Sequence, residues 1–194
     1  GLVFIDEINR KNPLKNTYIE ATNPCGEQPL LPFESCNLGS INLAHHVRQK
    51  KINWKKLEQT INTGVHFLDN AVDASNYVFK EIKQASRASR KIGLGVMGFA
   101  DMLFQLEIPY NSDEALRITE RLCKFMKSKA IEASERLAKK RRPFPSYKDS
   151  IYRWDKRRNA CITTISPTGT ISIISDVSQS IEPVFALAYS RIAL

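Results

Sequence analysis

Apolar residues recur at three- and four-residue steps in one long stretch of the chain, which is the spacing of a helix face. The positions are Leu57, Ile61, Val65, Leu68 and Val72. Asn53 stands where an N-cap belongs, so we predict a helix from residue 53 to about residue 79. A second helix is predicted over residues 92–106, where three glycines imply close backbone packing against a neighbour.

A third helix and one strand complete the predicted regular elements. Ser112 and Asp113 form a good helix start, and the apolar spacing continues from there to about residue 137. Residues 160–165 form a short β-branched segment, as in a buried strand, and they are followed by Ser166-Pro167. Shorter apolar segments follow at 171–174 and 184–192. This order predicts an α/β fold whose strands are widely spaced by helical connections.

The segment from residue 13 to residue 40 has a different character. It holds four prolines and two glycines, a density that forbids a regular helix. We expect an ordered, irregular loop region here. Gly1–Ile5 has no initiator methionine and reads as the middle of a strand or helix, so we expect the chain to be a fragment.

Composition places the chain among globular proteins. With 194 residues, of which 42% are hydrophobic and 25% charged, residues 1–194 are expected to form one domain or a large part of one. No apolar run approaches the roughly 20 residues that cross a bilayer, and no signal peptide is visible, so we expect a cytoplasmic protein without a membrane partner. The four cysteines are sparse and form no C-x-x-C, which predicts reduced, catalytic thiols and no metal site.

The positive charge is concentrated in one region. The chain has a net charge of +9, and residues 113–158 alone hold 15 basic and 7 acidic residues. Such a patch could bind nucleic acid or phosphate. A solvated helix face followed by a basic linker is the favoured explanation, because no aromatic residues alternate with the charges as they do in stacking platforms.

One loop carries three functional groups at alternate positions. Asn23, Cys25 and Glu27 supply an amide, a thiol and a carboxylate, with Pro24 and Gly26 between them. In an extended loop alternate side chains point the same way, so the three groups would converge on one small substrate. Taken alone, the pattern also fits an ordinary loop. For Cys36, which follows, a small buried hydrophobic residue is the commoner role of a free cysteine, and spacing alone does not decide.

A second candidate site follows the predicted strand. Pro167-Thr168-Gly169-Thr170 presents two hydroxyls and a glycine that frees backbone N–H groups. These groups suit a phosphate, especially if the next residues begin a helix whose N-terminus faces the anion. An ordinary turn is the alternative.

Several longer segments resemble, in the same order, those of ribonucleotide reductase catalytic subunits of the adenosylcobalamin-dependent type. The resemblance covers nearly the whole chain from Thr22 onward. The matching segments are Asn23–Pro32, Glu34–Leu43, Ile92–Asp101, Thr163–Ser172 and Ser180–Pro183.

The resemblance implies a role for each matching residue. Cys25 corresponds to the cysteine that becomes a thiyl radical and removes hydrogen from the ribose 3′ carbon. Glu27 corresponds to the carboxylate that takes the 3′-hydroxyl proton, and Asn23 to the amide that orients the intermediate. Cys36 corresponds to one of two thiols that reduce the substrate and close into a disulfide. Binding of the substrate phosphate is implied for Ser166, Thr168, Gly169 and Thr170.

The same resemblance implies part of a ten-stranded α/β barrel, in which the Cys25 loop is a central finger that keeps a radical from water. It also implies adenosylcobalamin as cofactor, a ribonucleotide substrate, a thioredoxin-like or dithiol reductant, and a homodimer. The cysteine that pairs with Cys36 has no counterpart here, and Cys123 and Cys161 are expected in core packing. We therefore expect no turnover by these 194 residues alone, and high mobility in residues 15–40.

Three alternatives stay open. Within the family, a partner subunit could deliver the radical. The basic clusters at 139–142 and 156–158 permit a nucleic-acid-binding module, whose binding would fall steeply with salt. A cysteine hydrolase would pair Cys25 with a histidine base, for which the candidates are His45, His46 and His66.

Overall fold

A computed structural model describes residues 1–152, 154–184, 186 and 188. The chain begins with α1 (Ile5–Arg10), β1 (Ala21–Thr22), β2 (Pro29–Leu30), β3 (Asn37–Asn42), the 3-10 helix η1 (Leu43–His46), β4 (Val47–Arg48) and β5 (Lys51–Ile52). It continues with α2 (Trp54–Ala74), α3 (Lys80–Ser89), β6 (Ile92–Met97), α4 (Phe99–Leu106), α5 (Asp113–Arg141), the 3-10 helix η2 (Pro145–Asp149) and α6 (Gly169–Ile174). This mixture of helices and strands agrees with the predicted α/β class.

Two parallel strands form the centre of the fold. β3 pairs with β6 in a register that runs from Asn37 opposite Ile92 to Asn42 opposite Met97. The other edge of β6 is hydrogen-bonded to the segment at 160–165, where the sequence predicted a strand. In the part of the chain that the structure describes, this segment forms an isolated bridge between Leu94 and Thr163 instead of a regular strand. Three backbone hydrogen bonds of 2.8–3.2 Å hold this segment parallel to β6.

The prediction of one helix over residues 92–106 is wrong in its first half. Residues 92–97 are the strand β6, buried along its whole length, and only residues 99–106 form a helix. A strand buried on both faces is apolar at every position, so periodicity cannot separate it from a buried helix. Gly98, at a φ of +69°, makes the turn between the two elements.

The other predicted helices exist with shifted ends. α2 begins at the predicted cap, where Asn53 Oδ1 accepts a hydrogen bond from the Lys56 N–H at 3.0 Å, but it ends at Ala74 rather than near residue 79. The separate helix α3 follows and was not predicted. α5 begins at the Ser112 cap, as predicted, and continues past residue 137 to Arg141.

The proline- and glycine-rich segment from residue 13 to residue 40 is irregular only in part, since its last residues belong to β3. β1 and β2 pair as a short antiparallel hairpin, with Ala21 opposite Leu30. The apolar segment 171–174 lies in α6. The apolar segment 184–192 lies mostly outside the described residues.

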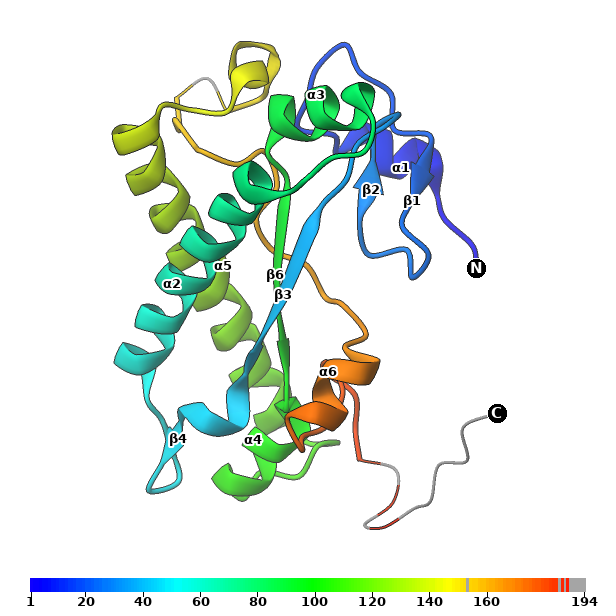
Figure 1. The fold of residues 1–194 in the computed structure, drawn as a ribbon. Helices are drawn as coiled ribbons and strands as arrows, with labels where there is room; N and C mark the ends of the chain where they lie inside the picture. Colours follow the sequence, from blue (N-terminus) through cyan, green and yellow to red (C-terminus); the bar gives the residue numbers. More distant parts are fainter. Residues whose placement is uncertain (153, 185, 187, 189–194) are drawn as a thin grey trace.

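The two sides of the central strands are covered differently (Figure 1). α2 and α5 lie on one side and bury the apolar core, which includes Leu57, Ile61, Val65, Ile92 and Leu94. The β1–β2 hairpin and α6 lie on the other side. In the described part of the chain, no helix is both long and apolar enough to cross a bilayer.

A buried ionic cluster ties α2 to the start of β6. Arg90 donates to Asp69 Oδ1 at 2.8 Å and to Asp73 Oδ1 at 2.7 Å, and both Asp69 and Arg90 are buried. Asn159 Nδ2 donates to the same Asp69 oxygen at 3.1 Å. The Arg90 guanidinium lowers the pKa of Asp73.

Part of the basic stretch is also paired internally. Arg158 donates to the carbonyl oxygens of Arg141 and Arg142 at 2.9 and 3.1 Å, and Arg141 donates to Asn70 Oδ1 at 2.5 Å. These basic side chains therefore help to fasten the end of α5, whereas Lys139 and Lys140 stay exposed.

Candidate functional site

The loop that carries Asn23, Cys25 and Glu27 is a tight turn at the end of the β1–β2 hairpin. The Gly26 N–H donates to the Asn23 carbonyl at 3.0 Å, and Gly26 has a φ of +84°. The Gln28 N–H donates to the Asn23 side-chain oxygen at 3.0 Å. The loop is therefore not the extended segment that the alternate spacing assumed, and Cys25 is exposed at its tip.

The hairpin rests on the face of β6 that lies opposite the apolar core. A Cβ placed on Gly93 would lie 2.5 Å from Leu38 Cδ2, 2.6 Å from Gln28 Nε2 and 2.9 Å from Thr164 Cγ2. Thr164 Oγ1 also donates to the Glu27 carbonyl at 3.2 Å. The absence of a side chain at Gly93 thus lets the hairpin approach the strand closely.

Glu27 has an unusual environment for a carboxylate. Its Oε2 atom is buried and has no hydrogen-bond partner among the described residues. Leaving a buried polar atom unpaired costs free energy, so such atoms often mark positions where a ligand or water binds. This oxygen is an acceptor that a substrate hydroxyl could fill.

Cys36 lies beside the same place, directly before β3. Burial, together with smaller effects of the neighbouring Cys161, Glu34 and Glu27, raises the pKa of its thiol to about 12, and Lys91 opposes this rise. The thiol therefore remains protonated at neutral pH. Because Glu27 is among the groups that raise the pKa of Cys36, these two predicted site residues lie near each other.

Two residues that the sequence interpretation missed stand next to Cys36. Lys91 Nζ lies 2.5 Å from Glu34 Oε2, and both side chains are only 1% exposed. Charged residues are rarely this buried unless they are paired. Lys91 immediately precedes the apolar residues of β6, and Glu34 precedes Cys36 by two positions. A charged residue directly beside an apolar segment was therefore the sequence signal that could have identified this buried pair.

The predicted phosphate segment is followed directly by a helix, α6, as the sequence interpretation required for a phosphate site. Thr168 precedes α6 with a φ of +58°, and its Oγ1 accepts the Ser180 N–H at 2.8 Å. Thr168 is buried, Ser166 and Gly169 are half-buried, and Thr170 is exposed. The hydroxyl of Thr168 is thus occupied in holding the loop, while that of Thr170 faces outward.

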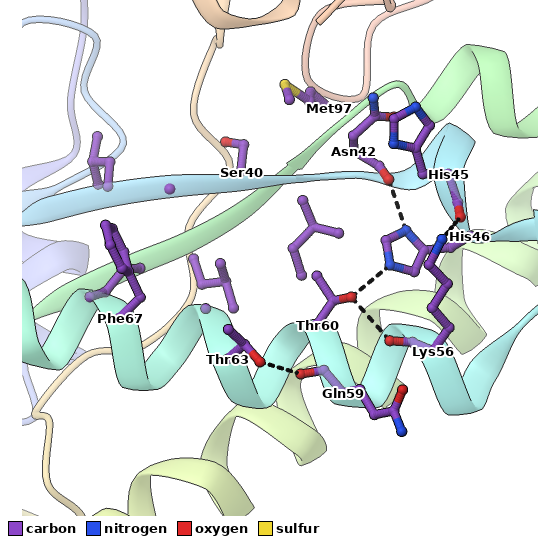
Figure 2. Close-up of a pocket in the computed structure, with 16 residues that line it drawn as sticks. Ser40, Asn42, His45, His46, Lys56, Gln59, Thr60, Thr63, Phe67 and Met97 are labelled. Atoms are coloured by element: carbon purple, nitrogen blue, oxygen red, sulfur yellow. Dashed lines mark hydrogen bonds between the residues drawn. The ribbon is translucent and has the colours of Figure 1, made fainter.

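The histidines are engaged elsewhere. Figure 2 shows a groove between β3 and α2, which has a volume of about 720 Å³. In this groove, His46 Nδ1 lies 2.8 Å from the Asn42 carbonyl oxygen and His46 Nε2 lies 2.9 Å from Thr60 Oγ1. His66 Nε2 lies 3.0 Å from Arg141 Nη2. His45 and His46 line this groove, but none of the predicted catalytic or phosphate-binding residues does. The groove therefore does not bring a histidine base next to Cys25.

The two remaining cysteines differ from each other. Cys123 is exposed on α5, so its predicted place in the core is wrong. A cysteine is small enough to be accepted at a helix surface, and apolar character alone did not reveal which face of α5 it occupies. Cys161 is half-buried, and burial raises the pKa of its thiol. In the described part of the chain, no group of three or more acidic, histidine or cysteine side chains could hold a metal ion.

Comparisons with known proteins identify the family. The family model for "Ribonucleotide reductase, barrel domain" matches residues 1–158 and 155–194. This chain belongs to that family. A vitamin B12-dependent ribonucleoside-diphosphate reductase of Thermoplasma acidophilum is 56% identical over 98% of the chain, and one of Mycobacterium tuberculosis (strain CDC 1551 / Oshkosh) is 52% identical over 98%.

More distant members of the ribonucleotide reductase family match too. A ribonucleoside-diphosphate reductase subunit alpha of Chlamydia pneumoniae is 34% identical over 95% of the chain. The chain covers 25% of the Thermoplasma protein, 28% of the Mycobacterium protein and 22% of the Chlamydia protein. It thus spans about a quarter of the length of these relatives.

Proposed function

We propose that this chain forms the radical-bearing part of a catalytic site that reduces ribonucleotides to deoxyribonucleotides, within one wall of a ten-stranded α/β barrel. The observation that carries the proposal is the hairpin, which presents Cys25 and a Glu27 oxygen that has no partner among the described residues, and which packs against β6 at Gly93. The names of two similar proteins support the proposal, since both are called vitamin B12-dependent ribonucleoside-diphosphate reductases.

Each site residue has a task that its environment suits. The exposed thiol of Cys25 is the group that would become a thiyl radical and take the 3′ hydrogen atom. The Glu27 Oε2 atom, which has no hydrogen-bond partner in the described part of the chain, would accept the 3′-hydroxyl proton, a transfer that requires a carboxylate within hydrogen-bonding reach. Asn23 is held by its own loop through its side-chain oxygen, which leaves the amide N–H groups to orient the substrate. Cys36 stays a thiol at neutral pH and would donate hydrogen in the reduction.

The substrate phosphate would lie at the start of α6. Three features support this position: Ser166 is half-buried, residue 169 is a glycine, and Thr170 is exposed. Backbone N–H groups in the first turn of a helix have no partner within the helix and favour an anion. The buried Thr168 would support the loop, because its Oγ1 already accepts the Ser180 N–H.

Adenosylcobalamin is the radical source that we propose. Two relatives are named as vitamin B12-dependent, and the chemistry of the donor set fits, because an exposed thiol at a loop tip can meet a radical generated outside this chain. When bound, the cofactor supplies the radical by cleavage of its cobalt–carbon bond. Activity with adenosylcobalamin and no second subunit would separate this type from one in which a partner protein delivers the radical.

The remaining partners follow from the same proposal. Each turnover oxidises two thiols, so a thioredoxin-like protein or a small dithiol must restore them. Free thiols of this kind persist in a reducing compartment, which favours the cytoplasm. A homodimer of the whole subunit is proposed on the resemblance alone.

The decisive experiment is Cys25→Ser in the full-length subunit that carries these residues. It should abolish both turnover and exchange of the substrate 3′ hydrogen, because serine cannot form the required radical at an accessible energy. Cys123→Ser is the matched control, since Cys123 is exposed on α5 and should be dispensable. Retained 3′ exchange in Cys25→Ser would reject the proposed function.

A further inference from the structure

The tip of the β1–β2 hairpin is held from outside by a threonine hydroxyl. Thr164 Oγ1 donates to the main-chain carbonyl of Glu27 at 3.2 Å, and both residues are half-buried. In the described part of the chain, no other hydrogen bond reaches residues 23–28 from outside the hairpin. The remaining bonds of the turn, such as that from the Gly26 N–H to the Asn23 carbonyl, stay within it. Thr164 is therefore the hydrogen-bonded link between this tip and the sheet.

Strand β6 fixes the place of Thr164 itself. The Leu94 N–H donates to the Ile162 carbonyl at 2.8 Å, and the Thr164 N–H donates to the Leu94 carbonyl at 3.2 Å. A Cβ placed on Gly95 would lie 2.9 Å from the Thr164 carbonyl oxygen, so the two main chains can be this close only because residue 95 is a glycine. Threonine is also β-branched, which restricts its χ1 angle. The hydroxyl is thus held in position by the sheet.

The far end of the hairpin has a separate support. Lys91 Nζ donates to the Pro29 carbonyl at 3.2 Å and to Glu34 Oε2 at 2.5 Å, and the Leu31 N–H donates to the same carboxylate oxygen at 2.9 Å. A buried ion pair with several partners is costly to separate. Removal of the Thr164 hydroxyl should therefore leave the hairpin attached to the fold and loosen only its tip.

The position of Thr164 along the chain connects two parts of the proposed site. It precedes Ser166 by two residues, and residues 166–170 are the proposed phosphate segment. One short segment therefore bonds the residue proposed to accept the 3′-hydroxyl proton and leads into the proposed phosphate site. A ribonucleotide holds its 3′-hydroxyl and its 5′-phosphate on one ribose, so the protein groups that meet them must keep a matching separation. A misplacement of about 1 Å can lower catalysis by about 100-fold.

We infer that Thr164 is a positioning residue that places the Glu27 carboxylate against the substrate 3′-hydroxyl. This inference rests on the proposed function. The hydrogen bond fixes the Glu27 carbonyl and the planar peptide that follows it, and so restricts the direction in which the side chain leaves the main chain. The Oε2 atom of Glu27 is buried and has no partner among the described residues, so it can accept a hydrogen bond from that hydroxyl. Without the Thr164 bond, the carboxylate would meet the hydroxyl less often in the geometry that proton transfer requires.

The test is a binding measurement on the full-length subunit in the absence of cofactor. Cytidine diphosphate and 3′-deoxycytidine diphosphate are titrated separately by isothermal titration calorimetry, and the ratio of their dissociation constants gives the preference for the 3′-hydroxyl. The parent protein should prefer cytidine diphosphate by about tenfold or more, as expected for a hydrogen bond to a carboxylate. Thr164→Val keeps the side-chain shape without the donor. It should reduce this preference to about threefold or less, with the affinity for the 3′-deoxy ligand within about twofold of the parent value.

Two control variants separate positioning from a general effect on the fold. Thr164→Ser keeps the hydroxyl and should restore the parent preference. Thr119→Val is the matched control, because Thr119 Oγ1 donates to the Ala115 carbonyl at 2.6 Å within α5, away from the hairpin. It removes the same kind of bond from another half-buried threonine and should leave both affinities unchanged. A purely structural role of Thr164 would instead weaken binding of both ligands together.

The outcomes that contradict the inference are defined by the same ratio. An equal preference in Thr164→Val and in the parent protein, or an equal loss of affinity for both ligands, would overturn the role of Thr164. Thr164→Ala, whose side chain is smaller than threonine, replaces the valine variant if the latter does not fold. Binding requires no radical, so this result is independent of 3′ hydrogen exchange in Cys25→Ser, and failure of the inference can be told apart from failure of the proposed function.

Discussion

Gly93→Ala should damage the site more than the fold. The added methyl group would lie 2.6 Å from Gln28 Nε2 and 2.5 Å from Leu38 Cδ2, whereas contacts to carbon are optimal near 3.5–4.0 Å. Relief therefore requires a shift of about 1 Å. Gln28 is only 4% exposed and follows Glu27 directly, so it cannot swing into solvent and must move with the hairpin.

The expected size follows from this displacement. Overpacking typically destabilises by about 1–3 kcal/mol, and replacing glycine recovers up to about 1 kcal/mol through the unfolded state, so a net loss of about 1–2 kcal/mol is expected. A misplacement of about 1 Å can lower catalysis by about 100-fold. The catalytic loss should exceed what the stability change explains, because Glu27 moves with Gln28.

The assay combines urea unfolding with steady-state kinetics of the full-length subunit. Gly39→Ala is the matched control, because it adds the same methyl group to the paired strand β3 at an ordinary 3.5 Å from Leu68. It should leave kcat/KM unchanged and stability within about 1 kcal/mol of the parent protein. Parent-like kcat/KM in a folded Gly93→Ala protein would refute the idea that close approach of the hairpin to β6 positions Glu27.

Three further changes test the supports of the site. Asp69→Ala should destabilise by about 3–5 kcal/mol in urea unfolding, because it removes the fully buried carboxylate that pairs with Arg90 and leaves that guanidinium with the half-exposed Asp73, and a loss below about 1 kcal/mol would contradict the cluster's importance. Asn53→Ala should cost about 1 kcal/mol by the same measurement through loss of the α2 cap, with no effect on 3′ exchange. Burial lowers the pKa of His46 below its model-compound value of 6.5, so its stabilisation is complete above about pH 6.5 and is lost as the pH falls toward the lower folded-state pKa. The pH dependence of unfolding should weaken in His46→Gln, and an unchanged dependence would assign it to other groups.

The sequence predicted the helices well where their signals were local. The caps at Asn53 and Ser112 and the apolar face of α2 each depend on residues a few positions apart, and the structure contains all three. β6 was mistaken for a helix because its burial on both faces is set by partners from distant segments. α3 was missed for a related reason, since its fully buried residues are serines, whose partners Glu34 and Ser35 lie more than 50 positions away.

The candidate site was found through motifs, and its geometry required the fold. The spacing of Asn23, Cys25 and Glu27 suggested three groups that point the same way, but the loop turns back on itself through the Gly26 N–H. What brings the site together is the close contact of the hairpin with Gly93 and Thr164, residues 65 or more positions away along the chain. No spacing within the motif encodes that contact.

The two faces of β6 show how one strand serves both stability and chemistry. On the helix side, Leu94 fills the space over Gly64 of α2, where an added Cβ would lie 3.0 Å from Leu94 Cδ1. On the opposite side, Gly93 and Gly95 carry no side chains, so the hairpin and the 160–165 segment can approach the backbone. A face that only formed part of a core would carry large apolar side chains, because small residues bury less apolar surface. This face instead carries glycines, and Leu38 on the same side is 38% exposed. Because large residues secure the strand from behind, its front can remain open for the proposed site residues Cys25 and Glu27 and for the proposed substrate, without loss of the sheet's position.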